Sequence, residues 1–332
     1  MIITQTPVRI SFFGGGTDYP QYFMQNEGET LVAAINKFSY LSVNSMSGLF
    51  DHRIRVSYTR TELTSTVDQI EHPSVRACLK FLGIEGGIEI HYAGDLPART
   101  GLGSSSSFTV GLLNALHALK GERVSPLQLA NEAVYVERDL LGELVGVQDQ
   151  YACAIGGFLH LRITRSGIVT PSLVPISPDR LGALTDRLLL IYTGIRREAQ
   201  DVLPEQLTRT EGGLNDEALE ALRGLVPVAI EVLCGSGPLD DFGRLLGEAW
   251  MYKRRLSSSV SSTAIDEMYD RAVNAGALGG KLLGAGGGGF LLFYVSPDRR
   301  RHVIGALSDL KEVSFSFYPF GTSIVANLSH NP

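Results

Sequence analysis

Cysteine is scarce in this sequence. Its three cysteines, Cys78, Cys153 and Cys234, are spread over 332 residues, and no two have the CxxC spacing of a zinc or redox site. An odd, widely spaced set does not build a disulfide framework, and it is typical of a protein in a reducing compartment. Small scaffolds held together by disulfides or zinc are therefore excluded, and we expect a cytoplasmic protein with a sizeable hydrophobic core.

The sequence also lacks an excess of positive charge and a long apolar segment. Lys and Arg number 29 against 35 Asp and Glu, which gives a net charge of −6. No global basic field is available to bind nucleic acid or an anionic membrane, so any anion must be bound at a local site. No apolar run approaches the ~20 residues that span a bilayer, and the first residues, "MIITQTPVRISFF", lack the order of regions of a signal peptide. We therefore expect small-molecule partners, with neither nucleic acid nor membrane among them.

Two common nucleotide-binding motifs are missing as well. No segment contains a Walker loop, which is GxxxxGK followed by Ser or Thr. Residues 284–289 match the letters of the dinucleotide fingerprint GxGxxG, but the following "FLLFYV" is typical of a strand, where that fingerprint requires a helix. A Rossmann dehydrogenase is therefore disfavoured.

Glycine, in contrast, is abundant and clustered. The 37 glycines concentrate at 14–16, 101–103, 276–280 and 284–289. Each cluster lies between apolar segments, which is typical of tight turns inside a fold and not of a linker.

The hydrophobic pattern predicts both strands and helices. Strands are predicted at 2–12, 31–46, 53–58, 87–97, 156–163 and 187–194. Helices are predicted at 72–83, 108–121 and 125–142, and a mostly helical segment at 197–275. Because strands and helices do not alternate strictly, we predict an α+β fold. A change of composition near 180–186 divides it into two domains, 1–185 and 186–332.

The stretch "DLPARTGLGSSSSF" (95–108) lies between a predicted strand and a predicted helix. Gly101 and Gly103 allow a sharp turn, and the four serines occupy the first turn of the helix. Free backbone N–H groups and the helix dipole bind anions at such a place. A simple helix cap needs only one serine. We therefore interpret the stretch as an anion-binding loop.

Several charged residues fall where a charge needs a partner. Glu137 lies in the middle of the apolar face of the helix predicted at 125–142. A buried carboxylate is costly unless a cation compensates it, so Glu137 predicts either an ion pair with an arginine or a site for a divalent metal ion. Arg9, in an otherwise apolar strand, requires a carboxylate or a phosphate. Asp18 follows the first glycine turn, and Asp149 follows the helix in "GVQDQY".

Together, these motifs resemble those of the GHMP kinases, the superfamily of galactokinase, homoserine kinase, mevalonate kinase and phosphomevalonate kinase. The segments "TPVRISFFGGGTDY", "LPARTGLGSSSS" and "KLLGAGGGGFLLF" are similar to the three family signatures and occur in the family's order. Glu137 and Asp149 are similar to the family's magnesium ligand and catalytic acid. The resemblance implies a mixed α/β N-terminal domain, a ferredoxin-like C-terminal domain and an active site in the cleft between them.

Within the superfamily, "RISFFGGGTDYPQYF", "INKFSY" and "KRRLSSSVS" look most like the heptose 7-phosphate kinases. This resemblance implies that ATP, with Mg²⁺, phosphorylates the anomeric hydroxyl of a heptose 7-phosphate that serves surface-polysaccharide synthesis. Galactokinase has an acidic residue and a histidine where this chain has Gly15 and Gly16, which disfavours a plain hexose. A fucokinase- or galactokinase-like enzyme and a non-catalytic sugar or nucleotide sensor are the alternatives. A homodimer is compatible with the sequence.

The resemblance also implies roles for individual residues. Asp149 and Arg9 are the implied catalytic residues, and Ser105 and Glu137 the implied ligands of Mg²⁺. The implied ATP-binding residues are Pro97, Gly101, Leu102, Gly103, Ser104, Ser105, Ser106 and Ser107. The implied substrate-binding residues are Gly15, Gly16, Thr17, Asp18, Tyr19, Lys37, Arg53, Lys253, Gly286 and Gly287. Arg55 and Arg254 are further candidates for binding the substrate's own phosphate group.

Overall fold

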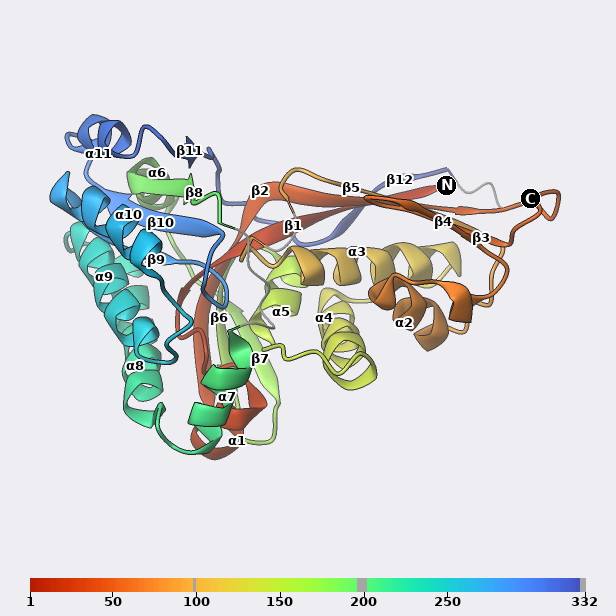
Figure 1. Ribbon diagram of the computed structural model, residues 1–332, viewed down its shortest axis with the longest axis horizontal. Coiled ribbons are helices and arrows are strands. Elements are labelled where there is room, and N and C mark those ends of the chain that lie inside the picture. The colour runs from red at the N-terminus through yellow and green to blue at the C-terminus, as the bar shows by residue number, and fades with distance from the viewer. Residues whose placement is uncertain (98–99, 196–201, 329–332) are drawn as a thin grey trace.

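The computed structural model describes residues 1–97, 100–195 and 202–328, which form two β-sheets with helices packed against them (Figure 1). The first sheet has eight strands in the order β12-β1-β2-β5-β3-β4, with β6 pairing with β2 and β7 pairing with β6. Its strands are β1 (Ile2–Phe13), β2 (Gly28–Ser45), β3 (Ile54–Ser57), β4 (Thr61–Thr64), β5 (Ile88–Gly94), β6 (Phe158–Ile163), β7 (Val169–Leu173) and β12 (Ser323–Asn327). The last strand of the chain thus lies beside the first.

The long strand β2 connects two parts of the first sheet. Its first part pairs with β6 and its second part with β5, while β1 pairs with it along nearly its whole length. Every residue of β1 from Thr6 to Phe13 is buried. A strand that is buried on both faces has a nearly continuous apolar sequence. Arg9 is the one charged residue in this buried part of β1.

A layer of helices covers one face of the first sheet (Figure 1). It comprises α2 (Pro73–Phe81), α3 (Ser104–Leu119), α4 (Pro126–Val134), the π-helical turn η2 (Tyr135–Leu140) and α5 (Gln148–Ile155). The central helix α3 packs against both β1 and β2. Its first turn is therefore fixed against the buried part of β1.

The second sheet belongs to the C-terminal part of the chain. Its order is β11-β8-β10-β9, and all its pairs are antiparallel. The strands are β8 (Leu188–Tyr192), β9 (Ala277–Leu282), β10 (Phe290–Val295) and β11 (Lys311–Glu312). Numbered along the chain this is the order 4-1-3-2, with helices between the first and second strands and between the third and fourth, which is the ferredoxin-like arrangement.

The remaining helices of the C-terminal part complete the molecule. They are α6 (Pro178–Arg187), α7 (Leu203–Glu211), α8 (Asp216–Cys234), α9 (Asp240–Arg254), α10 (Thr263–Asn274) and α11 (Arg300–Ala306). The short elements α1 (Pro20–Asn26) and η1 (Val67–Gln69) belong to the N-terminal part. One hydrophobic cluster runs from Phe12 and Phe158 of the first sheet to Phe242 and Phe290 of the C-terminal part. The two parts therefore share a core, while the helices under the first sheet have a second core of their own.

The mixed α+β prediction is confirmed, and two predicted helices differ in detail. The helix predicted at 125–142 is α4 followed by the π-helical turn η2, so it is not one regular helix. The helical segment predicted from residue 197 is described from α7 onward, and residues 197–201 lie outside the described part. No helix in the described residues is long and apolar enough to cross a membrane.

Candidate active site

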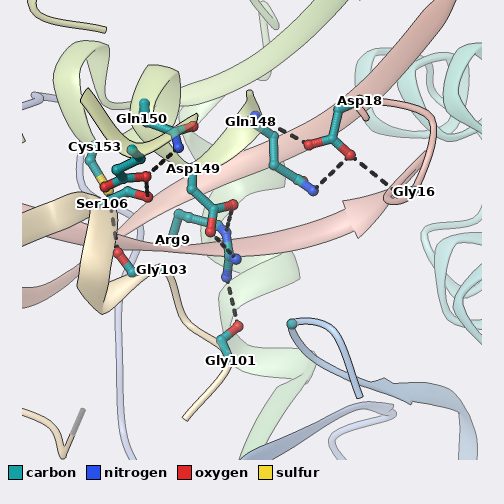
Figure 2. A network of polar contacts seen from close by, with 12 residues as sticks. Arg9, Gly16, Asp18, Gly101, Gly103, Ser106, Gln148, Asp149, Gln150 and Cys153 are labelled. Carbon is teal, nitrogen blue, oxygen red and sulfur yellow. Dashed lines mark hydrogen bonds and ion pairs between the residues drawn. The ribbon is translucent and has the colours of Figure 1, made fainter. Parts of the chain in front are cut away.

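Arg9 on β1 and Asp149 on α5 form a two-pronged ion pair. Arg9 Nε donates to Asp149 Oδ1 at 2.7 Å, and Nη2 donates to Oδ2 at 2.6 Å (Figure 2). The Arg9 side chain is 5% exposed and that of Asp149 is 26% exposed. Burial alone would lower the pKa of Arg9, but the adjacent Asp149 outweighs it and the pKa is raised. The buried arginine therefore stays charged, and the carboxylate that it fixes reaches solvent.

The same guanidinium holds the glycine–serine loop. Arg9 Nη1 donates to the carbonyl oxygen of Gly101 at 2.7 Å, and the backbone N–H of Arg9 donates to the carbonyl oxygen of Leu102 at 2.9 Å. Gly103 adopts a left-handed conformation with φ 74° immediately before α3, and a Cβ there would lie 3.2 Å from Arg9 Cγ. Arg9 thus links the predicted anion-binding loop to Asp149.

Asp18 lies beside this pair in a fully buried pocket of donors. Its carboxylate accepts hydrogen bonds from Gly16 N at 3.1 Å and from Gln148 N and Nε2 at 3.3 and 3.2 Å. Burial, and secondarily the charge of Asp149, raises the pKa of Asp18 to about 6. Gly146 leaves room for the carboxylate, since a Cβ there would lie 1.9 Å from Asp18 Oδ2. With a pKa of about 6, Asp18 is mostly an ionised hydrogen-bond acceptor at neutral pH.

Glu137 is buried in the π-helical turn η2, and no arginine among the described residues pairs with it. Its Oε2 accepts hydrogen bonds from Ser106 Oγ at 2.9 Å and from Gln150 Nε2 at 2.5 Å. Its Oε1 is buried and has no hydrogen-bond partner among the described residues. The nearby Thr109 hydroxyl donates to Ser105 O at 3.3 Å. Burial dominates and raises the pKa of Glu137 to about 7.

The donor set around Glu137 fits a divalent cation better than it fits an ion pair. A buried carboxylate oxygen without a partner, next to serine hydroxyls, is the type of ligand that Mg²⁺ prefers. Ser106 contacts Glu137 directly, whereas Ser105, the serine predicted to share a metal ion with it, is exposed in the first turn of α3. No group of three or more His, Cys, Asp or Glu residues in the described part could hold a metal ion alone. The other ligands of a bound metal ion would therefore be hydroxyl, water or substrate oxygens.

Three consecutive residues at the start of α5 organise the site, and the sequence analysis identified only one of them. Gln148 binds Asp18, Asp149 binds Arg9, and Gln150 binds Glu137 (Figure 2). Glutamine side chains carry no signal in a sequence pattern because they are ordinary on helix surfaces. Here Gln150 is fully buried and Gln148 is 8% exposed.

The second and third glycine motifs meet face to face. A Cβ on Gly284 would lie 2.4 Å from Gly101 Cα, and a Cβ on Gly289 would lie 2.3 Å from the carbonyl oxygen of Thr100. Gly286 and Gly287 lie against Val260, since Gly287 N donates to Val260 O at 2.9 Å. These contacts require glycine because any side chain would separate the two loops. The glycine turn at 284–289 therefore supports the glycine–serine loop from the C-terminal part of the chain.

Two buried lysines hold the glycine turn and strand β1. Lys253 Nζ donates to the carbonyl oxygens of Leu282 (2.9 Å) and Gly284 (2.5 Å), and Lys281 Nζ donates to Phe12 O (2.7 Å). Burial, with Arg9 adding to it, lowers the pKa of Lys253 to about 7 and that of Lys281 well below its ordinary value. Lys253 was predicted to bind substrate, but it is occupied by backbone carbonyls. Lys281 was missed, although a charge in the otherwise apolar strand β9 is the same signal that identified Arg9 on β1.

Two further residues predicted to bind substrate, Thr17 and Tyr19, flank Asp18 in the sequence. Thr17 is fully buried, with its hydroxyl donating to the backbone of Gly14 and Glu29, so it fixes the first glycine turn. Tyr19 lies at the site; burial first, then Asp18 and Asp149, raises the pKa of its hydroxyl, which stays a proton donor.

The other cations predicted to bind the substrate's phosphate do not converge on this site. Lys37 is half-buried on β2. Arg53 is exposed just before β3, and β3 lies at the end of the first sheet that is far from the second sheet (Figure 1). Arg55 pairs with Glu89 at 2.7 Å, and Arg254 pairs with Asp266 at 2.7 Å.

Comparison with known families and proteins is consistent across both parts of the chain. Residues 66–157 match the family described as GHMP kinases N terminal domain, and residues 229–312 match GHMP kinases C terminal. The chain is 31% identical over 322 residues to the D-glycero-alpha-D-manno-heptose 7-phosphate kinase of Campylobacter jejuni, covering 92% of this chain and 93% of that protein. It is 28% identical to the L-fucokinase/L-fucose-1-P guanylyltransferase of Bacteroides fragilis, covering 89% of this chain and 34% of that protein.

Solved structures show the same fold. The crystal structure of a D-glycero-D-manno-heptose 1-phosphate kinase from Bacteroides thetaiotaomicron has a TM-score of 0.79 at 24% identity, covering 99% of this chain and 100% of that one. The galactokinase of Lactococcus lactis complexed with galactose has a TM-score of 0.75 at 19% identity, covering 97% and 94%. At these identities the structural likeness concerns the fold alone.

Proposed function

The chain belongs to the GHMP kinases, and we propose that it transfers the γ-phosphoryl group of ATP to the anomeric hydroxyl of a heptose 7-phosphate. One observation carries this proposal: Arg9 joins a solvent-reaching carboxylate, Asp149, directly to the glycine–serine loop. An acceptor carboxylate next to an anion-binding loop is the arrangement needed to bring a hydroxyl group to a phosphoryl group.

The loop at 101–107 would bind the ATP phosphates. The first turn of α3 starts at Ser104, and N–H groups at a helix start have no intrahelical acceptor. The helix dipole adds a favourable field for anions. The buried guanidinium of Arg9, fixed under Gly101, would stabilise charge on the transferring phosphoryl group.

Asp149 would orient the attacking hydroxyl and accept its proton. A phosphoryl-transfer transition state is loose, so positioning and electrostatics contribute more than the strength of the base. The two hydrogen bonds from Arg9 fix the rotamer of Asp149 and keep its charge compensated. Asp18, held by Gln148 from the adjacent position on α5, would bind further sugar hydroxyls.

Glu137, with serine oxygens of the loop, would hold Mg²⁺. Ser105 is the proposed second ligand because it is exposed in the first turn of α3, and Ser106 fixes the carboxylate through its hydrogen bond. When bound, the ion supplies positive charge that neutralises the ATP phosphates. Because the pKa of Glu137 is raised to about 7, metal binding should release a proton near neutral pH.

The choice of sugar rests on the first glycine turn and on the relatives. At Gly15 and Gly16 the chain lacks the acidic residue and the histidine expected of a galactokinase, which disfavours a plain hexose. The Campylobacter relative is named as a heptose 7-phosphate kinase, and the Bacteroides structure as a heptose 1-phosphate kinase. The phosphorylated position is therefore part of what must be measured.

The test is incubation of the protein with Mg-ATP and a panel of acceptors, scored for ADP release and for the product's phosphorus NMR signals. The panel contains heptose 7-phosphate, the unphosphorylated heptose, L-fucose and galactose. The proposal predicts preferential turnover of heptose 7-phosphate with a new anomeric phosphate signal. Preference for L-fucose or galactose would replace it with a fucokinase- or galactokinase-like activity, and binding without turnover of any acceptor would indicate a sensor.

A further inference from the structure

Three serines of the stretch "KRRLSSSVS" (253–261) hold a carboxylate that the site described above does not use. The carboxylate of Glu205, on α7, accepts four hydrogen bonds from three consecutive serines. Its Oε2 accepts from Ser257 Oγ at 2.8 Å, Ser258 Oγ at 3.0 Å and Ser259 Oγ at 3.3 Å, and its Oε1 accepts from Ser258 N at 3.1 Å. Three hydroxyls and one backbone N–H thus converge on a single anion. We call residues 257–259 the serine nest.

The serine nest adjoins both motifs that form the active site. Leu256, the residue before it, lies against the first glycine turn, because a Cβ on Gly16 would lie 3.6 Å from Leu256 Cδ1. Val260, the residue after it, accepts a hydrogen bond from Gly287 of the third glycine motif. The nest is therefore joined by adjacent residues to the sugar side and to the loop-supporting side of the site.

A cation accompanies the nest. Arg209 is four residues after Glu205 on α7, so both side chains lie on the same face of that helix. Arg209 Nε donates to the carbonyl oxygen of Leu256 at 3.1 Å, and no carboxylate pairs with this guanidinium among the described residues. The neighbouring Arg254 and Arg255 are instead paired with Asp266 and Glu217.

We propose that the serine nest and Arg209 form the subsite for the phosphate group that the substrate already carries, and that the carboxylate of Glu205 must give way to it. Hydroxyl and backbone donors together with one guanidinium are the groups that bind a phosphate monoester. Glu205 marks the position of the anion, and its own negative charge opposes a phosphate there. This inference rests on the proposed function, since only a phosphorylated sugar would need the subsite.

The kinetic test compares heptose 7-phosphate with the unphosphorylated heptose. The double substitution Ser258→Ala/Ser259→Ala should lower kcat/KM for heptose 7-phosphate by about tenfold or more, mainly through KM, because hydrogen bonds to a charged group are lost. It should leave kcat/KM for the unphosphorylated heptose within about twofold. Glu205→Gln should lower KM for heptose 7-phosphate several-fold. Ser261→Ala is the matched control, because Ser261 lies in the same loop but its hydroxyl donates to Asp266. It should leave kcat/KM unchanged for both substrates.

Two kinetic results would overturn the subsite. One is an equal effect of the serine substitutions on both substrates, and the other is a higher KM for heptose 7-phosphate in Glu205→Gln. A binding measurement separates this failure from failure of the proposed function, because it needs no turnover. With saturating ADP present, inorganic phosphate should raise the unfolding midpoint of Glu205→Gln more than that of the wild type. Adding Ser258→Ala and Ser259→Ala to Glu205→Gln should abolish this additional rise in the unfolding midpoint. A rise that persists in the triple variant would refute phosphate binding at the serine nest.

Discussion

Replacing Glu137 by Gln should make the protein more stable and less active at once. Burial raises the pKa of Glu137 to about 7 from an ordinary 4.5. Between these values the folded chain binds more protons than the unfolded chain, so the free energy of unfolding falls as the pH rises. The stabilisation is fully present below pH 4.5 and is lost as the pH passes 7. The difference between the two pKa values corresponds to about 3 kcal/mol in the free energy of unfolding.

Glu137→Gln removes this ionisation while keeping the size of the side chain and an acceptor for Ser106. We therefore expect the variant to be more stable than the wild type by about 2–3 kcal/mol at pH 8 without metal, and by less than about 1 kcal/mol at pH 5. Turnover should fall steeply, because a neutral amide is a poor ligand for Mg²⁺.

Urea unfolding at both pH values, without metal, measures the effect. Asp139→Asn is the matched control, because Asp139 belongs to the same π-helical turn but its side chain is 44% exposed and pairs only weakly with Arg138 at 3.4 Å. It should change stability little at either pH. A Glu137→Gln protein that is less stable than the wild type at pH 8, or that gains equally at both pH values, would refute the buried unpaired carboxylate.

Two further predictions concern the sugar side and the loop contact. Because the pKa of Asp18 is raised to about 6, KM for the sugar should increase as the pH falls below 6. Asp18→Asn should raise this KM about tenfold or more and remove its pH dependence. A wild-type KM that does not change with pH would contradict this prediction. Gly284→Ala should raise KM for ATP, because its φ is 73° and the new Cβ would lie 2.4 Å from Gly101 Cα. Gly121→Ala is the control for backbone strain alone, because Gly121 has φ 78° and a Cβ there would meet no atom within 4 Å. It should lower the free energy of unfolding by about 1 kcal/mol and leave KM for ATP unchanged. Equal effects of Gly284→Ala and Gly121→Ala on KM for ATP would argue against the loop contact.

Local pattern was sufficient to locate the charged residues that need partners. Arg9 stood out as a charge in an apolar strand, and the structure provides the expected carboxylate in Asp149. Glu137 stood out on an apolar helix face and is 1% exposed. Both predictions were based on the free-energy cost of burying a charge without a partner.

The partners themselves could not be predicted from local pattern. Gln148 and Gln150 reach Asp18 and Glu137 only because α5 packs against β1 on one side and against α3 and α4 on the other. The π-helical turn after Val134 interrupts the regular helix, and the apolar pattern gives no sign of this interruption. The contact between Gly101 and Gly284 depends on how the two parts of the chain pack, which no spacing within one motif encodes.

The central claim is that Asp149, fixed by Arg9, presents the sugar hydroxyl to a phosphoryl group held at the glycine–serine loop. Its most direct test is kcat of Asp149→Asn on heptose 7-phosphate at saturating Mg-ATP, with nucleotide affinity measured in parallel. The account predicts that kcat falls by about 100-fold or more while ATP affinity stays within a few-fold of the wild type. Turnover near the wild-type rate would contradict it.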